Sequence, residues 1–312
     1  MNRLLRVLLR IIVVLFLVFN IIIACHAYKF THYYDRGSVT LIPENQKSGW
    51  DKTKDILFGF TFVKQENSKP DTLYQTINLL TAKKVNIEAW YFAVPDPKGT
   101  VILFHGHGGK KSGNLVEAKG FRSMGFNTMM VDFEAHGNSG GNTTTIGFKE
   151  AEDVKLAYDY VRNLGEKHII LWGISMGAAT VSKAINDYSL QPEKVILEMP
   201  FASMLDAVKG RIKMMKLPPQ PIATFLTFWG GVENGFWAFN YKPAEYVKHI
   251  YCPVLLQWGR HDPRVMSQET YQVFGNIPGK KKLVIYEESG HESLCQKEHD
   301  KWMENVSSFL KP

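Results

Sequence analysis

The segment that most constrains the fold of this chain is the pentapeptide at residues 173–177, which reads Gly-Ile-Ser-Met-Gly. It follows an apolar run at 168–172 and precedes small and apolar residues at 178–181, a pattern that predicts a buried strand, a tight turn and a helix. Glycines on either side of Ser175 remove Cβ atoms that would collide where the strand reverses into the helix. Such a turn leaves the serine hydroxyl exposed above a sheet, where it can act as a nucleophile.

Two further apolar segments end in residues that could assist this serine. Asp262 follows a predicted strand at 253–259, and His291 follows another at 282–286. A histidine that takes the proton of a serine, and is itself oriented by a carboxylate, is the arrangement used for acyl transfer. The order along the chain is therefore Ser175, Asp262, His291, with each residue just beyond a strand.

Each assignment has an alternative. Asp262 precedes a proline, so it could instead cap a turn. His291 could be a hydrogen-bonded core or surface histidine. His261 is a rival candidate for the base. Because it is the direct neighbour of Asp262 in the chain, we expect its side chain to point away from the site.

Two loops add to the pattern. The strand at 100–104 runs into His-Gly-His-Gly-Gly at 105–109, and the strand at 127–131 runs into residues 132–141. With the serine–acid–histidine order, these loops make the chain resemble the α/β-hydrolase family from about residue 85 onward. The first is similar to the family's His-Gly-x-Gly oxyanion loop. The second is similar to its Asp-x-x-Gly-x-Gly-x-Ser loop, with Glu-Ala-His where Arg-Gly-His is commoner.

The resemblance implies a fold and a set of backbone roles. The fold is α/β: a mainly parallel, doubly wound sheet with helices on both faces and a cap insertion. The nearest-looking branch is the serine aminopeptidase-like, monoacylglycerol-lipase-like hydrolases, here as a bacterial membrane-anchored member. The N–H groups of His107 and Met176 would receive an oxyanion. We expect the side chain of His107 to face solvent, and His105 and His136 to buttress the loops by hydrogen bonds.

The pattern divides the chain into three parts: an anchor at 1–27, an approach segment at 28–72, and a hydrolase domain at 73–312 with its cap at about 201–250. Residues 72–80 and 85–92 alternate as an antiparallel hairpin, and 146–161 has helical periodicity. We expect the approach segment to wrap the outside of the domain and to supply no chemistry.

The N-terminus carries a membrane-targeting signal, because three arginines precede a long apolar run. Residues 7–27 would span about 31 Å as a helix, enough for the hydrocarbon layer. An uncleaved signal anchor is one interpretation; a lipoprotein signal with Cys25 as the lipidated residue and a cleaved secretory signal are the others. All three place the catalytic domain on the non-cytoplasmic side, periplasmic or extracellular. We expect the domain to remain active without residues 1–27.

The insertion at 201–250 is rich in methionine, proline and aromatic residues. An apolar cap of this kind predicts a pocket for an acyl chain, with Phe225 and Phe228 as candidate lining residues. The alternative is that these side chains only pack the cap onto the domain.

Composition limits the classes of partner and cofactor that we expect for this protein. The net charge is +7, but the basic residues are scattered, which argues against a nucleic-acid partner. Three cysteines do not make a disulfide framework, although a Cys252–Cys295 bridge stays open beside free thiols. No Cys, His and carboxylate cluster has metal-ligand spacing, so we expect neither a metal nor a cofactor.

These features predict a serine hydrolase that cleaves carboxylic esters with apolar or lipid-like acyl groups. An aminopeptidase or amidase of the same fold is the alternative, but the cap offers only Asp206, Glu233 and Glu245 to hold a substrate amine. A catalytically silent membrane-anchored binding protein is the third possibility. The full set of serine, acid, histidine and oxyanion loop argues against it.

Overall fold

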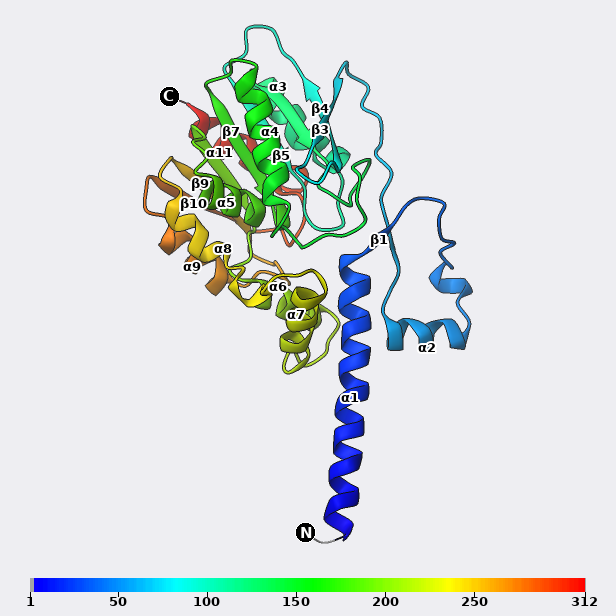
Figure 1. Ribbon diagram of the computed structural model, residues 1–312. Helices are drawn as coiled ribbons and strands as arrows, with labels where there is room; N and C mark the ends of the chain where they lie inside the picture. Colours follow the sequence, from blue (N-terminus) through cyan, green and yellow to red (C-terminus); the bar gives the residue numbers. More distant parts are fainter. Residues whose placement is uncertain (1–2, 312) are drawn as a thin grey trace.

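The computed structural model describes residues 3–311, so Pro312 and the first two residues of the predicted anchor lie outside the described residues. The main sheet contains eight strands: β3 (Gln75–Leu80), β4 (Asn86–Phe92), β5 (Thr100–Phe104), β6 (Asn127–Val131), β7 (Ile169–Ile174), β8 (Lys194–Glu198), β9 (Val254–Gly259) and β10 (Lys281–Tyr286). Their spatial order is β10-β9-β8-β7-β5-β6-β4-β3 (Figure 1). Neighbours from β10 to β6 are parallel, whereas β4 is antiparallel to β6 and to β3. The predicted parallel sheet and its antiparallel hairpin are confirmed.

Helices cover both faces of this sheet, as predicted. One face carries α3 (Leu115–Ser123), α10 (Leu294–Lys297) and α11 (His299–Leu310), and the other carries α4 (Ala151–Asn163), α5 (Met176–Tyr188) and α9 (Ser267–Asn276). Strand β5 shows the consequence for the sequence: Val101 and Leu103 belong to the core on the α3 face, while Ile102 and Phe104 belong to the core on the α4 face. A strand buried on both faces must be apolar throughout, which is why these strands are unbroken apolar runs.

Helix α4 begins five residues later than its periodicity predicts. The carboxylate of Glu150 accepts hydrogen bonds from the hydroxyls of Thr144 and Thr145 and from the N–H of Gly147. These bonds fold residues 144–150 into a turn around the carboxylate, so the regular helix starts only at Ala151.

The insertion at 201–250 contains α6 (Met204–Met214), α7 (Ile222–Glu233), α8 (Pro243–Tyr246) and the short 3-10 helices η3 (Ala238–Asn240) and η4 (Val247–His249). Helix α8 packs on α5 and α9, and η4 packs on the same two helices. The part that projects from the domain is therefore α6, α7 and η3, which pack on one another, with α7 beside α1 (Figure 1).

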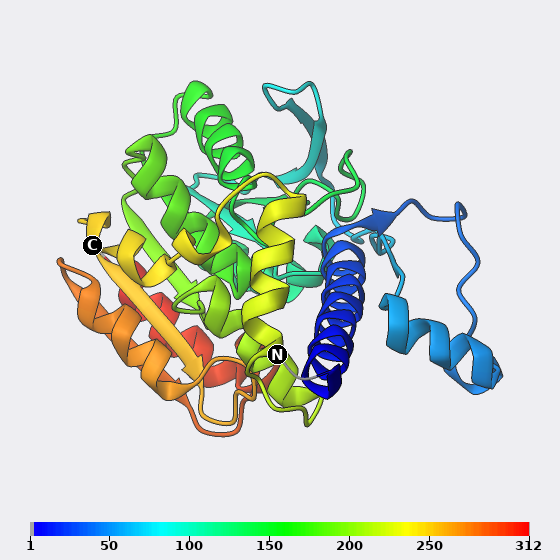
Figure 2. The same cartoon turned by 60° about the horizontal axis from the view of Figure 1, so that its bottom comes forward.

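The N-terminal part contains α1 (Arg3–Thr31), β1 (Tyr33–Tyr34), η1 (Glu44–Gln46), α2 (Gly49–Phe58) and β2 (Phe62–Val63), with β1 parallel to β2. Helix α1 extends away from the domain with α7 on one side and α2 on the other (Figures 1 and 2). Its length and composition are those of a membrane-spanning helix.

The contact between α1 and α7 is specific. The ring of Phe225 packs edge-on against Phe16 and Phe19 of α1, with centroids 5.9 and 5.3 Å apart. One turn further, the indole N–H of Trp229 donates to the side-chain oxygen of Asn20 at 3.1 Å. Helix α1 is therefore packed against the cap and is not separate from the domain.

Candidate active site

Ser175 lies at the turn between β7 and α5, in a backbone conformation that non-glycine residues rarely adopt (φ 54°, ψ −115°). Its N–H donates to the carbonyl of Glu198 at 2.7 Å, which ties the turn to β8. A Cβ at Gly173 would lie 2.5 Å from the carbonyl carbon of Gly177, and one at Gly177 would lie 2.2 Å from the oxygen of Phe104. Both positions of the predicted turn thus require glycine for close approach.

The structure brings together the three side chains predicted from the sequence. His291 Nε2 lies 2.8 Å from Ser175 Oγ, and His291 Nδ1 lies 2.7 Å from Asp262 Oδ2. The other oxygen of Asp262 accepts the N–H groups of Arg264 and Val265 at 2.7 and 2.9 Å. Asp262 therefore caps its loop with one oxygen and holds His291 with the other.

His261 does not join this group. Its side chain is exposed, and its N–H donates to the carbonyl of Ser289. The geometry favours His291 over His261 as the base for Ser175.

The loop after β5 crosses over the serine. A Cβ built at Gly106 would lie 3.4 Å from the Cβ of Ser175, so the backbone between His105 and His107 runs directly above the hydroxyl. Met176 is the first residue of α5, where N–H groups have no partner within the helix. These are the two places from which the sequence predicts oxyanion donors.

Two histidines hold this loop, as expected. His105 Nε2 accepts the N–H of Phe133 and its Nδ1 donates to the carbonyl of Gly106, while His136 Nε2 accepts the N–H of Gly108 at 3.1 Å. Burial lowers the pKa of His105 to about 3, so the ring is neutral and can accept. The structural role predicted for His105 and His136 is confirmed.

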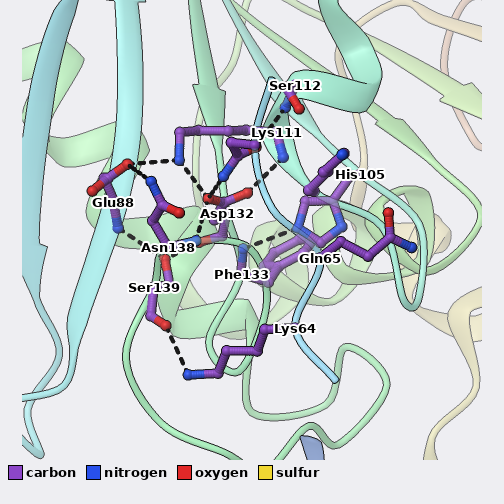
Figure 3. Close-up of polar contacts among 12 residues, drawn as sticks. Lys64, Gln65, Glu88, His105, Lys111, Ser112, Asp132, Phe133, Asn138 and Ser139 are labelled. Carbon is purple, nitrogen blue, oxygen red and sulfur yellow. Dashed lines mark hydrogen bonds and ion pairs between the residues drawn. The ribbon is translucent and has the colours of Figure 1, made fainter. Parts of the chain in front are cut away.

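A buried polar network fixes the second loop (Figure 3). The Lys111 ammonium, which is fully buried, pairs with Asp132 and with Glu88, the latter at 2.8 Å. Asp132 also accepts the N–H of Asn138 at 2.8 Å, and its carbonyl accepts the hydroxyl of Ser139 at 2.7 Å. Because Lys111 follows the loop at 105–109 and Asp132 begins the loop at 132–141, the network holds the two loops in fixed positions relative to each other.

The prediction that the side chain of His107 faces solvent is wrong. The ring stacks on Phe30 at 4.5 Å, and its nitrogens lie 3.3 Å from the hydroxyl of Tyr33 and 3.5 Å from a guanidinium nitrogen of Arg211. It is covered because α1 and the residues that follow it pack over the loop. The sequence contained no local signal for this contact, which joins residues more than seventy positions apart.

A cavity of about 460 Å³ adjoins Ser175 and His291. Two parts of the chain line it besides the hydrolase core: the cap and the N-terminal segment. The cap residues are Phe201, Met204, Ala207, Val208, Arg211, Ile212, Met215, Leu226, Thr227, Gly230, Phe236 and Ala238, and the N-terminal residues are His26, Ala27, Lys29, Phe30, Thr31, Phe60 and Phe62. The approach segment therefore does more than wrap the outside, since it forms part of the cavity wall.

The two aromatic residues expected in this cavity lie elsewhere. Phe225 faces α1, and Phe228 packs against Trp229 and Trp237 while remaining partly exposed. On a helix, Leu226 and Gly230 lie on one face and Phe225 and Trp229 on another. The sequence alone did not decide which face meets the substrate, because both are apolar.

The cysteines are free: Cys25, Cys252 and Cys295 form no disulfide, which rules out the Cys252–Cys295 bridge. Within residues 3–311, no group of three or more His, Cys, Asp and Glu side chains could hold a metal ion.

Comparison with known proteins identifies the class. Residues 95–228 match the family described as serine aminopeptidase, S33. The esterase Pf2001 of Pyrococcus furiosus superposes with a TM-score of 0.66 at 22% identity, covering 81% of this chain and 98% of that one. The chain therefore has the α/β-hydrolase fold, and the matched family and relatives support a hydrolase. Its more specific resemblance is to the serine aminopeptidase-like branch.

Two curated relatives show how far the similarity extends. The uncharacterized protein YqkD of Bacillus subtilis is 26% identical over 72% of this chain and 75% of its own length. The lysophosphatidylserine lipase ABHD12 of Macaca fascicularis is 24% identical over 58% of this chain. The matched region covers only 46% of that lipase, so its activity does not transfer directly.

Proposed function

We propose that this protein is a membrane-anchored serine hydrolase that cleaves carboxylic esters with apolar, lipid-like acyl groups. The observation that carries the proposal is the continuous chain of contacts from Asp262 through His291 to Ser175, placed at the wall of an apolar cavity.

The contacts support a two-step acyl transfer. His291 Nε2 takes the proton from Ser175 as the hydroxyl oxygen bonds to the carbonyl carbon, and Asp262 stabilises the imidazolium that forms. The N–H groups of His107 and Met176 receive the negative charge that develops on the carbonyl oxygen. His291 then gives its proton to the leaving alcohol. Water, activated by His291 again, hydrolyses the acyl-enzyme and restores Ser175.

Esters are favoured over peptides by the charges at the cavity. A free amino terminus needs a carboxylate to hold it, but none of the cavity-lining residues in the described part of the chain is Asp or Glu. The charged lining residues are cationic: Lys29, Arg211 and Arg264. The lining is otherwise mostly apolar, which suits an acyl chain.

Helix α1 is best explained as an uncleaved signal anchor. Arg3, Arg6 and Arg10 precede its apolar part, and such residues stay on the cytoplasmic side, which puts the catalytic domain on the other side of the membrane. Cleavage before Cys25 would remove Phe16, Phe19 and Asn20, which contact α7. We propose the corresponding division of the chain into an anchor at 1–27, an approach segment at 28–72 and a hydrolase domain at 73–312.

A fluorophosphonate probe tests the nucleophile. We expect it to label the wild-type protein and not Ser175→Ala, with Ser182→Ala, at a buried serine of α5, as the control that remains labelled. Hydrolysis of esters of graded acyl length beside aminoacyl anilides tests the substrate class. Equal labelling of both serine variants would refute the nucleophile assignment, and faster cleavage of anilides than of esters would make the protein an amidase.

A further inference from the structure

We propose that Arg211 and Arg264 form an anion subsite beside the catalytic serine, so that the ester substrate carries a negatively charged group, phosphate or carboxylate, near the bond that is cleaved. The inference rests on the proposed esterase function and adds the charge class of its substrate.

Arg211, on α6, is a largely buried cation without a carboxylate. One guanidinium nitrogen lies 3.5 Å from His107 Nδ1, and the group lies over the ring of Phe30 at 4.9 Å. No ion pair among residues 3–311 includes Arg211, whereas the buried Lys111 has two carboxylates around it. Burying a charge is costly unless an opposite charge or several hydrogen bonds compensate it. The guanidinium of Arg211 thus retains hydrogen-bond donors for a ligand.

Arg264 adds a second cation to the same cavity. Its backbone N–H donates to the carboxylate of Asp262, whereas its side-chain Nε lies 3.2 Å from the sulfur of Met214, so this side-chain contact is also uncharged. Burial, and then the charge of Arg264, lower the pKa of Arg211 to about 10, which leaves Arg211 protonated at neutral pH. Two like charges facing one cavity repel each other, and an anion between them relieves that repulsion.

Close backbone packing fixes the separation of these residues. A Cβ at Gly210 would lie 2.1 Å from the carbonyl oxygen of Arg264, so α6 is pressed against the loop that carries the acid of the triad. Any larger residue at 210 would push Arg211 away from Arg264. The pair is therefore held by the backbone of two elements rather than by flexible side chains alone.

The position of the pair indicates which part of the substrate is charged. Arg211 contacts His107, whose neighbour Gly106 lies over Ser175, and Arg264 is two residues from Asp262. Lys29, the other cation of the cavity, already contacts Thr61 and Tyr34. The apolar wall formed by Leu226 and its neighbours suits the acyl chain, so the anion belongs to the polar head of the ester. Guanidinium groups suit both phosphate and carboxylate, because each can accept two parallel hydrogen bonds.

The test compares three oleoyl esters in micelles of an uncharged detergent, using the full-length protein. Oleoyl glycerol is neutral, oleoyl glycerol phosphate carries a phosphate, and the oleoyl ester of glyceric acid carries a carboxylate. We expect wild-type kcat/KM to favour at least one charged ester over the neutral one by about fivefold or more. Arg211→Met should lower that ratio about tenfold, Arg211→Lys should lower it less, and Arg264→Met should also lower it.

Lys213→Met is the matched control, since it removes one positive charge from the exposed side of the same helix and should leave the ratio unchanged. A wild-type preference for the neutral ester, or a ratio that Arg211→Met and Arg264→Met do not change, would overturn the anion subsite while leaving the esterase intact. If no ester is cleaved, the proposed function fails instead. Binding of oleoyl glycerol phosphate and of oleoyl glycerol to Ser175→Ala, with and without Arg211→Met, then decides the subsite by itself.

Discussion

The hydroxyl of Ser175 is positioned by the backbone around it. A positive φ at a serine costs of the order of 1–3 kcal/mol, and it persists only where the surroundings enforce it. Here the N–H of Ser175 donates to the backbone carbonyl of Glu198, and Gly177 lies against the carbonyl of Phe104. His291 and Asp262 then need only side-chain bonds to complete the arrangement.

At this scale the two histidines near Asp262 should respond differently to substitution. His291→Ala should lower kcat by roughly 10⁴-fold, because it removes the group that transfers the proton. Asp262→Asn should lower kcat by a comparable or somewhat smaller factor, because it removes the carboxylate that orients His291. His261→Ala, at an exposed side chain, should retain nearly full activity. Steady-state kinetics on a short-chain ester measure all three. If His261→Ala were inactive and His291→Ala active, His261 would be the base instead of His291.

At the scale of elements, β7, β8, β9 and α11 meet at one buried carboxyl group. Glu198 Oε1 accepts the indole N–H groups of Trp172 at 3.0 Å and Trp302 at 2.7 Å, and the amide of Gln257 at 2.9 Å. Burial, together with the nearby Glu117 carboxyl, raises the pKa of Glu198 from 4.5 to about 8. The group that joins the strands beneath the serine is therefore protonated at neutral pH.

This raised pKa makes the stability depend on pH. Between about 4.5 and 8 the folded chain binds a proton at Glu198 that the unfolded chain has lost, so folding stability falls as the pH rises through this window. The fall is at most about 1.4 kcal/mol per pH unit. Glu198→Gln should flatten this dependence and unfold at a higher temperature than the wild type at pH 8.5. Thermal unfolding at pH 5.5, 7 and 8.5 measures it.

Glu304→Gln, an exposed carboxylate on α11, is the control for that experiment and should keep the wild-type slope. If the unfolding temperature changes equally with pH in the wild type and in Glu198→Gln, Glu198 is ionised in the folded protein across this range.

At the scale of the whole molecule, α1 has two contacts that an anchor does not need. It packs along α7, and its last turns contribute His26, Ala27 and Phe30 to the cavity wall. The expectation that the domain stays active without residues 1–27 is therefore revised. Removing them would open the cavity and expose the α1-facing side of α7.

Two neighbouring residues of α7 separate packing from substrate contact. Leu226→Ala should lower the kcat/KM ratio of octanoate to acetate esters by about fourfold or more, because a buried methylene contributes about 0.8 kcal/mol. Phe225→Ala should lower the unfolding temperature and reduce activity equally on all esters, since its ring meets Phe16 and Phe19. An altered chain-length ratio in Phe225→Ala, with none in Leu226→Ala, would reverse the assignment of the two helix faces.

Features that depend on neighbours along the chain could be predicted from the sequence. Unbroken apolar runs specify strands buried on both faces, and two glycines around Ser175 specify the turn. The chain order of Ser175, Asp262 and His291, with the two loops, sufficed to predict the fold and three side chains that the structure brings within hydrogen-bond distance of one another.

Contacts between surfaces that are far apart in the chain could be seen only in the folded structure. The contact of α1 with the cap, the stacking of Phe30 on His107 and the placement of Arg211 beside Arg264 each join segments that no local pattern links. Helix α7 is apolar on more than one face, so periodicity could not choose between Phe225 and Leu226 as the cavity-lining residue. That choice depends on the helix packed beside it, and therefore on the fold.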